Sequence, residues 1–285
     1  MNARIIDICS IAVMIGFFES IAHWRRAACG FISNTIESSC VLPHDVGQVI
    51  GFSVHHRPIL CYRMGNGARR VLFFAGIHGN ETGTVKFVQR LFHALSYRMQ
   101  YHHWQFLLIP CTNPDGYAEA RQRPDYSHGG RIGRCNAHAV DLNRNFPTPS
   151  FVSSAIWNYG KNYRENTPVY AGDHPASEPE VQALISFILR EKPDLIVAFH
   201  NAGGDVIGNP DQRSCTLAKS FANASGYRLP RDVHWNDLGQ TGTAAEWCAL
   251  QEIPYVEVEG RSRWASDWKR QKRGVEAMIH CLEQQ

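Results

Sequence analysis

The sequence of 285 residues contains no CxxC pair, no long run of lysine and arginine, no internal repeat and no low-complexity tract. Its nine cysteines are scattered and odd in number, which argues against a disulfide scaffold or a cysteine-based zinc finger and favours a reducing compartment. The formal net charge of +3 is too small to indicate a nucleic-acid partner. The chain is long enough to bury a large core, and its 44% of hydrophobic residues is ordinary for a globular protein.

The chain also lacks an uninterrupted apolar run long enough to cross a bilayer. Its most apolar N-terminal stretch, residues 5–18, follows Arg4 as the core of a signal peptide would. However, Asp7 interrupts this stretch, Glu19 follows it at once, and no clean A-x-A cleavage site is present. We therefore expect no stable membrane span.

Two regions follow from this pattern. We expect residues 1–45 to form an N-terminal extension, as a helical arm or a signal-like segment, and residues 46–285 to form one catalytic domain. A cytoplasmic location is favoured, and a secreted or periplasmic one stays open if residues 1–25 act as a signal.

Short apolar runs alternate with amphipathic stretches in the second region, which predicts an α/β fold with a mixed, mostly parallel central sheet and helices on both faces. The predicted strands are residues 59–64, 70–75, 104–109, 195–199 and 255–259. The predicted helices are residues 82–99, 179–192 after a Ser177-x-x-Glu180 capping box, 216–227 and 264–282. Between them, residues 111–151 are polar and rich in glycine and proline, which is typical of a functional or disordered segment.

Three polar side chains stand at predicted strand ends. His78 and Glu81 lie on a turn with Gly76 and Gly79, so that an imidazole and a carboxylate can face one ion. His200 follows another apolar strand, and taken alone it would more simply be a buried histidine at a sheet edge. Together, two histidines and one glutamate form the ligand set of a catalytic zinc site, which keeps a fourth position for water.

Seven short segments, taken in order, make the chain resemble the zinc carboxypeptidase family, the metallopeptidases related to carboxypeptidase A. The matching segments are residues 76–81, 113–116, 134–136, 140–147, 177–180, 199–200 and 253–259. Each segment is a weak match, but the ordered set is specific and spans about residues 47 to 260. The resemblance implies the family fold, one Zn²⁺ per chain and hydrolysis of a peptide bond next to a free C-terminal carboxylate.

The resemblance also assigns roles. His78, Glu81 and His200 would hold zinc, which would polarise the scissile carbonyl and lower the pKa of its water towards neutrality. Glu259 matches the family's general base. Glu257 is a rival, since residues two apart on a strand face the same way, although the family usually has threonine there. Glu257 would instead raise the pKa of Glu259, bind a cationic group of the substrate, or be a solvated carboxylate.

Four further polar residues complete the implied site. Asn143 and Arg144 match the pair that binds the terminal carboxylate of the substrate, because a guanidinium fork can bind a carboxylate through two hydrogen bonds. Arg134 matches the arginine that stabilises the developing oxyanion, with Arg131 as a nearby alternative. Asp141 is expected to orient a zinc-binding histidine.

One feature departs from the digestive-type carboxypeptidases, which place a tyrosine some twenty residues before the base. Asp237 stands there instead, and no tyrosine occurs between Tyr227 and Tyr255. We expect Asp237 to contact substrate, with Trp235 and Glu246 as further residues that shape specificity.

The segment 239–243 resembles the compact bacterial branch of the family that includes murein tripeptide amidases. These enzymes cleave the γ-D-glutamyl–diaminopimelate bond. Acidic residues at positions 237, 246 and 257 would suit a substrate with a free amine. The expected partner is therefore a small peptide with a free C-terminal carboxylate, and not nucleic acid.

Two other functions stay open. The succinylglutamate desuccinylase and aspartoacylase group shares the His-Gly-Asn-Glu and Asp-Leu-Asn-Arg elements and hydrolyses N-acyl amino acids, although the segments 113–116 and 177–180 and the context of Arg134 favour a peptidase. An inactive peptide-binding module is the second alternative, which the complete set of ligands, base and clamp opposes. The absence of a G-x-S-x-G elbow argues against a serine hydrolase.

Overall fold

The structure is a computed structural model that describes residues 47–96, 103–125, 130–159, 165–230 and 239–284. The predicted N-terminal extension, residues 1–45, lies outside the described residues, so its division from the rest of the chain stays a prediction.

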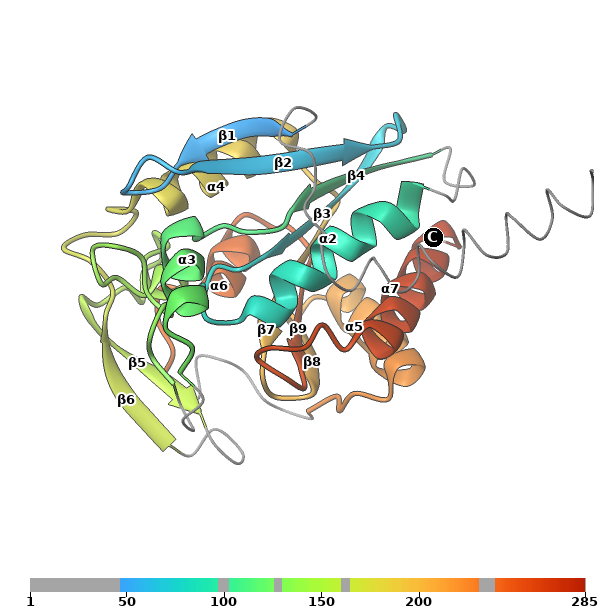
Figure 1. Ribbon diagram of the computed structural model, residues 1–285. Coiled ribbons are helices and arrows are strands. Elements are labelled where there is room, and N and C mark those ends of the chain that lie inside the picture. Colours follow the sequence, from blue (N-terminus) through green and yellow to red (C-terminus); the bar gives the residue numbers. More distant parts are fainter. Residues whose placement is uncertain (1–46, 97–102, 126–129, 160–164, 231–238, 285) are drawn as a thin grey trace, which may run out of the picture. The chain divides into compact units, whose positions relative to one another are not determined.

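The described residues form a seven-stranded sheet with the strand order β1-β2-β4-β3-β7-β9-β8 (Figure 1). The strands are β1 Gln48–Phe52, β2 Pro58–Met64, β3 Arg69–Ala75, β4 Trp104–Ile109, β7 Leu195–Asn201, β8 Asp205–Gly208 and β9 Tyr255–Gly260. The central strands β4, β3, β7 and β9 run parallel, while β1, β2 and β8 are antiparallel to their neighbours. A separate antiparallel pair joins β5, Ser154–Tyr159, to β6, Glu165–Tyr170.

Helices cover both faces of the large sheet, as the sequence predicted. They are α2 Thr82–Ser96, α3 Pro114–Gln122, the 3₁₀ helix η2 Leu142–Arg144, α4 Pro179–Glu191, α5 Gln212–Ser225, α6 Ala244–Leu250 and α7 Trp268–Glu283. Along β3, Val71 and Phe73 belong to a core with residues of α2, α5 and α7, whereas Leu72 and Phe74 belong to a second core with residues of α4 and α6. Because successive side chains of a strand alternate between faces, a continuous apolar strand needs cover on both sides.

Within the ranges described above, no helix combines the length and the apolar character that a membrane crossing requires.

The predicted capping box at the start of α4 is wrong. Helix α4 begins after Glu178, whose side chain makes no capping hydrogen bond. The Ser177 hydroxyl donates to Glu178 Oε1 at 2.7 Å, and Glu180 accepts from the Val54 amide at 3.1 Å and from Asn136 Nδ2 at 3.1 Å. The side chains of Ser177 and Glu180 therefore bond to other groups and do not form a capping box.

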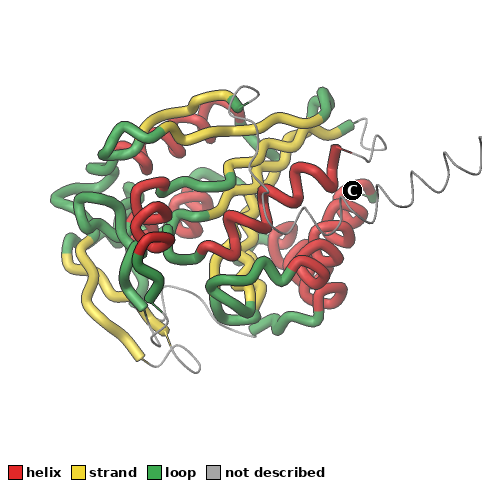
Figure 2. The backbone as a smooth tube through the Cα atoms, viewed as in Figure 1, coloured by secondary structure: helices red, strands yellow, loops and turns green. Residues whose placement is uncertain are grey.

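The described parts of the polar segment 111–151, residues 111–125 and 130–151, contain two short helices. Asn113 caps α3 by accepting from the Gly116 amide at 2.9 Å, and Asp141 caps η2 by accepting from the Asn143 amide at 3.2 Å. The remainder is largely loop and turn (Figure 2). The sequence patterns of residues 111–151 did not predict either helix, because both are too short for an apolar periodicity.

The doubly covered sheet makes a stability prediction. Phe73 is fully buried in β3 and its ring lies 6.0 Å from that of Phe106 and 6.2 Å from that of Phe199. We expect Phe73→Ala to lower the free energy of unfolding by about 3–5 kcal/mol, measured by denaturant titration. The control Phe52→Ala removes a side chain that is 52% exposed and should change it by about 0.5 kcal/mol or less. Equal losses in the two variants would contradict this account.

Candidate active site

The predicted site residues meet where the central parallel strands end. His78 follows β3, His200 lies near the end of β7, and Glu259 lies near the end of β9 (Figure 1). His200 and Glu259 are directly paired in the register of β7 and β9. Since parallel strands bring their carboxyl ends to one edge of a sheet, the topology itself gathers these side chains.

His78, Glu81 and His200 form a buried group whose ligand atoms all lie within 4.8 Å of one another. His78 Nδ1 is 2.9 Å from Glu81 Oε1, and His200 Nδ1 is 3.4 Å from Glu81 Oε2. The two Nδ1 atoms are 3.3 Å apart. The structure thus brings together all three predicted metal ligands, with one nitrogen of each ring facing the same point.

Two contacts orient these side chains. Asp141 Oδ1 lies 3.1 Å from His78 Nε2, where it would accept the ring proton when Nδ1 binds a metal ion. The Asn201 amide donates to Glu81 Oε2 at 3.1 Å. Asp141 therefore takes the orienting position that the sequence predicted.

The electrostatics of the group favour a cation. Burial alone would lower the pKa of His200, but the carboxylates of Glu257 and Glu81 raise it to about 9. Burial likewise opposes ionisation of Glu81, yet His78 and His200 hold its pKa well below the ordinary value. Two imidazole nitrogens only 3.3 Å apart repel each other unless a proton or a metal cation lies between them. Two histidines with one glutamate are a ligand set that suits zinc.

The segment 113–116, one of the segments that resemble the family, holds the loops that carry the zinc ligands and Arg134. Asn113 Nδ2 lies 3.4 Å from both the Ile77 and the Arg134 carbonyl oxygens and so links the zinc-ligand turn to the arginine loop. A Cβ on Gly79 would lie 2.1 Å from the Tyr117 amide nitrogen, so only glycine allows this close approach.

Arg134, rather than Arg131, lies in the site. Its Nε and Nη2 contact Asp141 Oδ2 at 3.0 and 2.8 Å, and its guanidinium stacks 4.1 Å above the Trp157 ring. Its Nη1 is 3.9 Å from Glu81 Oε1, which places this end of the side chain beside the ligand group. Arg131 is exposed and donates to Thr167 on β6.

Arg144 is almost fully buried and lacks a carboxylate in hydrogen-bond contact within the described ranges. Its Nε donates to the Ile156 carbonyl at 2.9 Å, Nη1 to the Asn143 carbonyl at 2.7 Å and Nη2 to Gln240 Oε1 at 2.8 Å. A guanidinium has five N–H groups, so one remains on each terminal nitrogen. Burial lowers the pKa of Arg144 to about 10, and the side chain stays a cation at neutral pH.

Asn143 completes a site for an anion. Its Oδ1 accepts from the Ala244 amide at 2.9 Å, which fixes the side chain and leaves the amide nitrogen to donate elsewhere. A Cβ on Gly242, which has a φ of +64°, would lie 2.2 Å from the Arg144 carbonyl oxygen. Gly242 therefore allows this loop to approach the clamp closely.

Glu259 and Glu257 share one face of β9 but have different surroundings. Burial and the carboxylates of Glu81 and Glu257 raise the pKa of Glu259 to about 8, although His200 opposes this shift. Glu257 Oε2 lies 3.9 Å from His200 Nε2, the nitrogen on the other side of the ring from the ligand group. Glu257 is only 5% exposed, so its interpretation as a solvated carboxylate is wrong.

The remaining specificity residues divide into two groups. Asp237 and Trp235 lie outside the described residues and stay predictions. Glu246 accepts a hydrogen bond from Ser150, and its amide donates to Thr243 Oγ1 at 3.1 Å at the start of α6. Glu246 therefore has a local role in holding α6, whatever it contributes to substrate choice.

Three residues of the site were not singled out from the sequence. Gln240 bonds Arg144, Trp157 stacks on Arg134, and the Tyr255 hydroxyl donates to Glu257 Oε2 at 3.0 Å. Tyr255 had a usable signal, since it precedes Glu257 by two positions on the predicted strand. Gln240 lies in the segment 239–243 that the resemblance singled out, without a role of its own. Trp157 had no signal, because it reaches the site through long-range folding.

The chain belongs to the zinc carboxypeptidase family, whose model matches residues 46–249. It is therefore a zinc-dependent peptide hydrolase, and the predicted family, enzyme class and cofactor are confirmed.

Among its relatives is murein peptide amidase A of Escherichia coli K12, which is 32% identical over 192 residues, 66% of this chain and 69% of the relative. γ-D-Glutamyl-L-diamino acid endopeptidase 1 of Lysinibacillus sphaericus is 26% identical over 219 residues, 65% of this chain and 54% of the relative.

Solved structures confirm the fold. The murein-tripeptide amidase of Escherichia coli O157 has a TM-score of 0.62 at 24% identity, covering 85% of this chain and 93% of that chain. Carboxypeptidase A of Helicoverpa armigera has a TM-score of 0.63 at 18% identity, covering 82% and 67%.

The position of Asp141 makes a prediction about metal affinity. Asp141→Asn keeps the size of the side chain but weakens the bond that fixes the His78 ring. We expect zinc affinity to fall by about 10–100-fold, measured by competition with a chromophoric chelator. Asp173→Asn, which removes a carboxylate bonded to the Tyr170 hydroxyl, is the control and should leave zinc affinity unchanged. An unaltered affinity in Asp141→Asn would argue against its orienting role.

Proposed function

We propose that this protein hydrolyses the bond between a γ-D-glutamyl residue and a C-terminal diamino acid in small murein peptides. The observation that carries the proposal is that Asp141, which lies 3.1 Å from the zinc ligand His78, caps the short helix η2 that carries Arg144. Arg144 is a buried cation that keeps two N–H groups for a carboxylate. The names of the two relatives support the choice of bond, since both describe action on murein or γ-D-glutamyl–diamino acid peptides.

Each residue of the site has a separate role in this reaction. Arg144 and the Asn143 amide bind the terminal carboxylate and so place the preceding amide bond against the ligand group. When bound by His78, Glu81 and His200, zinc supplies the positive charge that polarises the scissile carbonyl and acidifies water. The remaining residues, Arg134 and Glu259, act on the reacting atoms directly.

Glu259 acts as the general base. It takes one proton from the attacking water, and the same proton passes to the leaving amine when the carbon–nitrogen bond breaks. Its place beside His200 in the register supports this role, whereas Glu257 lies behind the His200 ring. Arg134 Nη1 donates to the oxygen that becomes negative, while Asp141 holds the rest of its guanidinium.

An N-acyl amino acid hydrolase of the desuccinylase or aspartoacylase type is the second candidate, since it would also need a carboxylate clamp and a zinc group. For the cellular location we propose the cytoplasm, on the basis of the scattered, odd-numbered cysteines.

A substrate panel tests the function. We expect the zinc-loaded protein to release diaminopimelate from L-alanyl-γ-D-glutamyl-diaminopimelate and to leave N-acetylaspartate and N-succinylglutamate intact, measured by mass spectrometry. Glu259→Gln should lower kcat by about 10²–10⁴-fold with little change in KM, because it removes the proton acceptor alone. Cleavage of the N-acyl amino acids in preference to the tripeptide would overturn the proposal. A variant Glu259→Gln that stays active would overturn the assignment of the base.

The clamp makes a separate prediction. Arg144→Lys keeps the charge but cannot present two parallel N–H groups. We expect kcat/KM for the peptide to fall by about 10–150-fold, the equivalent of one hydrogen bond to a charged group. The matched control Arg131→Lys alters an exposed arginine and should have no effect. If Arg144→Lys reduced cleavage of the free acid and of its C-terminal amide equally, binding of the terminal carboxylate by Arg144 would be contradicted.

A further inference from the structure

Glu257 is a buried carboxylate whose ion pair with His200 Nε2 is as long as 3.9 Å. Its side chain is 5% exposed, and the Tyr255 hydroxyl donates to Oε2 at 3.0 Å. The other oxygen, Oε1, has no hydrogen-bond partner in the part of the chain that the structure describes. Oε1 is not among the fully buried atoms that lack a partner, so it keeps some contact with solvent and can accept a hydrogen bond from a bound substrate.

The place of Glu257 connects it with the leaving side of the substrate. Tyr255 packs in the same core as Leu142 of η2, the helix that carries Arg144. Glu257 shares one face of β9 with Glu259, and its Oε2 lies 3.9 Å from Nε2 of the zinc ligand His200. Glu257 therefore lies among the residues that hold the substrate in the proposed function.

We propose that Glu257 binds the side-chain ammonium of the diamino acid that the protein releases, with the Tyr255 hydroxyl fixing the carboxylate for this contact. The proposal rests on the proposed function and names its substrate class more closely, as a C-terminal residue with a second, positively charged amine. An ammonium has three N–H donors and supplies both the charge and the partner that Oε1 lacks.

Two other roles fit the geometry less well. A general base must reach the reacting water, but Glu257 lies near Nε2 of His200, on the opposite side of the ring from the ligand atoms. An orienting partner of His200 would form a hydrogen bond, and the separation of 3.9 Å is too long for one.

The test compares two substrates that differ by one amine. They are L-alanyl-γ-D-glutamyl-diaminopimelate and the same tripeptide ending in 2-aminopimelate, which keeps both carboxylates but lacks the distal amine. We expect the wild-type protein to prefer the first by about 30-fold or more in kcat/KM, as for a buried charge pair that loses one partner. Glu257→Gln should abolish that preference, because kcat/KM for the diaminopimelate peptide should fall further than kcat/KM for the 2-aminopimelate peptide.

The control and a second measurement separate this role from a structural one. Glu252→Gln removes the same charge at an exposed turn and should leave the preference intact. Tyr255→Phe should weaken the preference by about 2–10-fold, the effect of one hydrogen bond. Zinc content and thermal midpoint are measured for each variant to verify that the site and fold persist.

The outcomes are distinct. Equal cleavage of both tripeptides by the wild-type protein, or an equal loss on both in Glu257→Gln, would overturn the inference. If neither tripeptide is cleaved, the proposed function fails, and a second pair decides the inference by itself. That pair is two acyl dipeptides that end in lysine or in norleucine. A Glu257-dependent preference for lysine supports the ammonium site, and its absence removes it.

Discussion

The Asp141 carboxylate is the contact on which the rest of the site depends. One oxygen faces His78 Nε2 and the other accepts from Arg134, so a single buried side chain aligns a zinc ligand and the oxyanion arginine. Arg134 and His78 hold the pKa of Asp141 well below its ordinary value despite its burial. A charge so placed is stable only while both partners stay in position, which couples the geometry of the ion site to that of the arginine.

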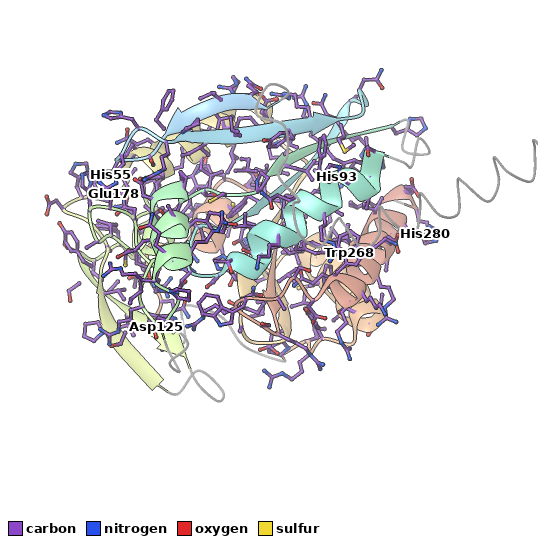
Figure 3. The ribbon with its side chains drawn as sticks, viewed as in Figure 1. His55, His93, Asp125, Glu178, Trp268 and His280 are labelled. Atoms are coloured by element: carbon purple, nitrogen blue, oxygen red, sulfur yellow. The ribbon has the colours of Figure 1, made fainter. Side chains whose placement is uncertain are left out.

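The loops that surround Asp141 are held by a second polar network at some distance from the reacting atoms. Asn136 Nδ2 donates to Glu178 at 2.6 Å and to Glu180 at 3.1 Å, and thereby ties the arginine loop to the start of α4. Asp115 of α3 in turn accepts from the His55 amide at 2.9 Å, and Figure 3 labels His55 and Glu178 in this region. The segments that resemble the family away from the zinc ligands therefore serve to fix loop positions.

The sequence predicted the central strands and the strand-end positions of His78 and His200, because apolar runs and the residues that follow them are local patterns. It could not predict the β5–β6 pair, which serves both arginines: Trp157 stacks on Arg134, and the Ile156 carbonyl accepts from Arg144. It also assigned Ser177 to a helix cap, whereas the Ser177 hydroxyl accepts a hydrogen bond from Asn145 Nδ2 at 3.0 Å. These contacts join residues far apart in the chain, and no local pattern encodes them.

In the proposed function, two opposite charges at the carboxyl edge of the sheet account for substrate choice. Arg144 supplies a positive group for a terminal carboxylate, and Glu257 supplies a negative group for an amine on the same residue. A leaving residue with only one of these groups would satisfy one buried charge and desolvate the other, which costs binding energy. The clamp of Asn143 and Arg144 binds the carboxylate of a diamino acid and of an ordinary amino acid alike. The protein then discriminates between them because an ordinary amino acid leaves the Glu257 carboxylate without a partner.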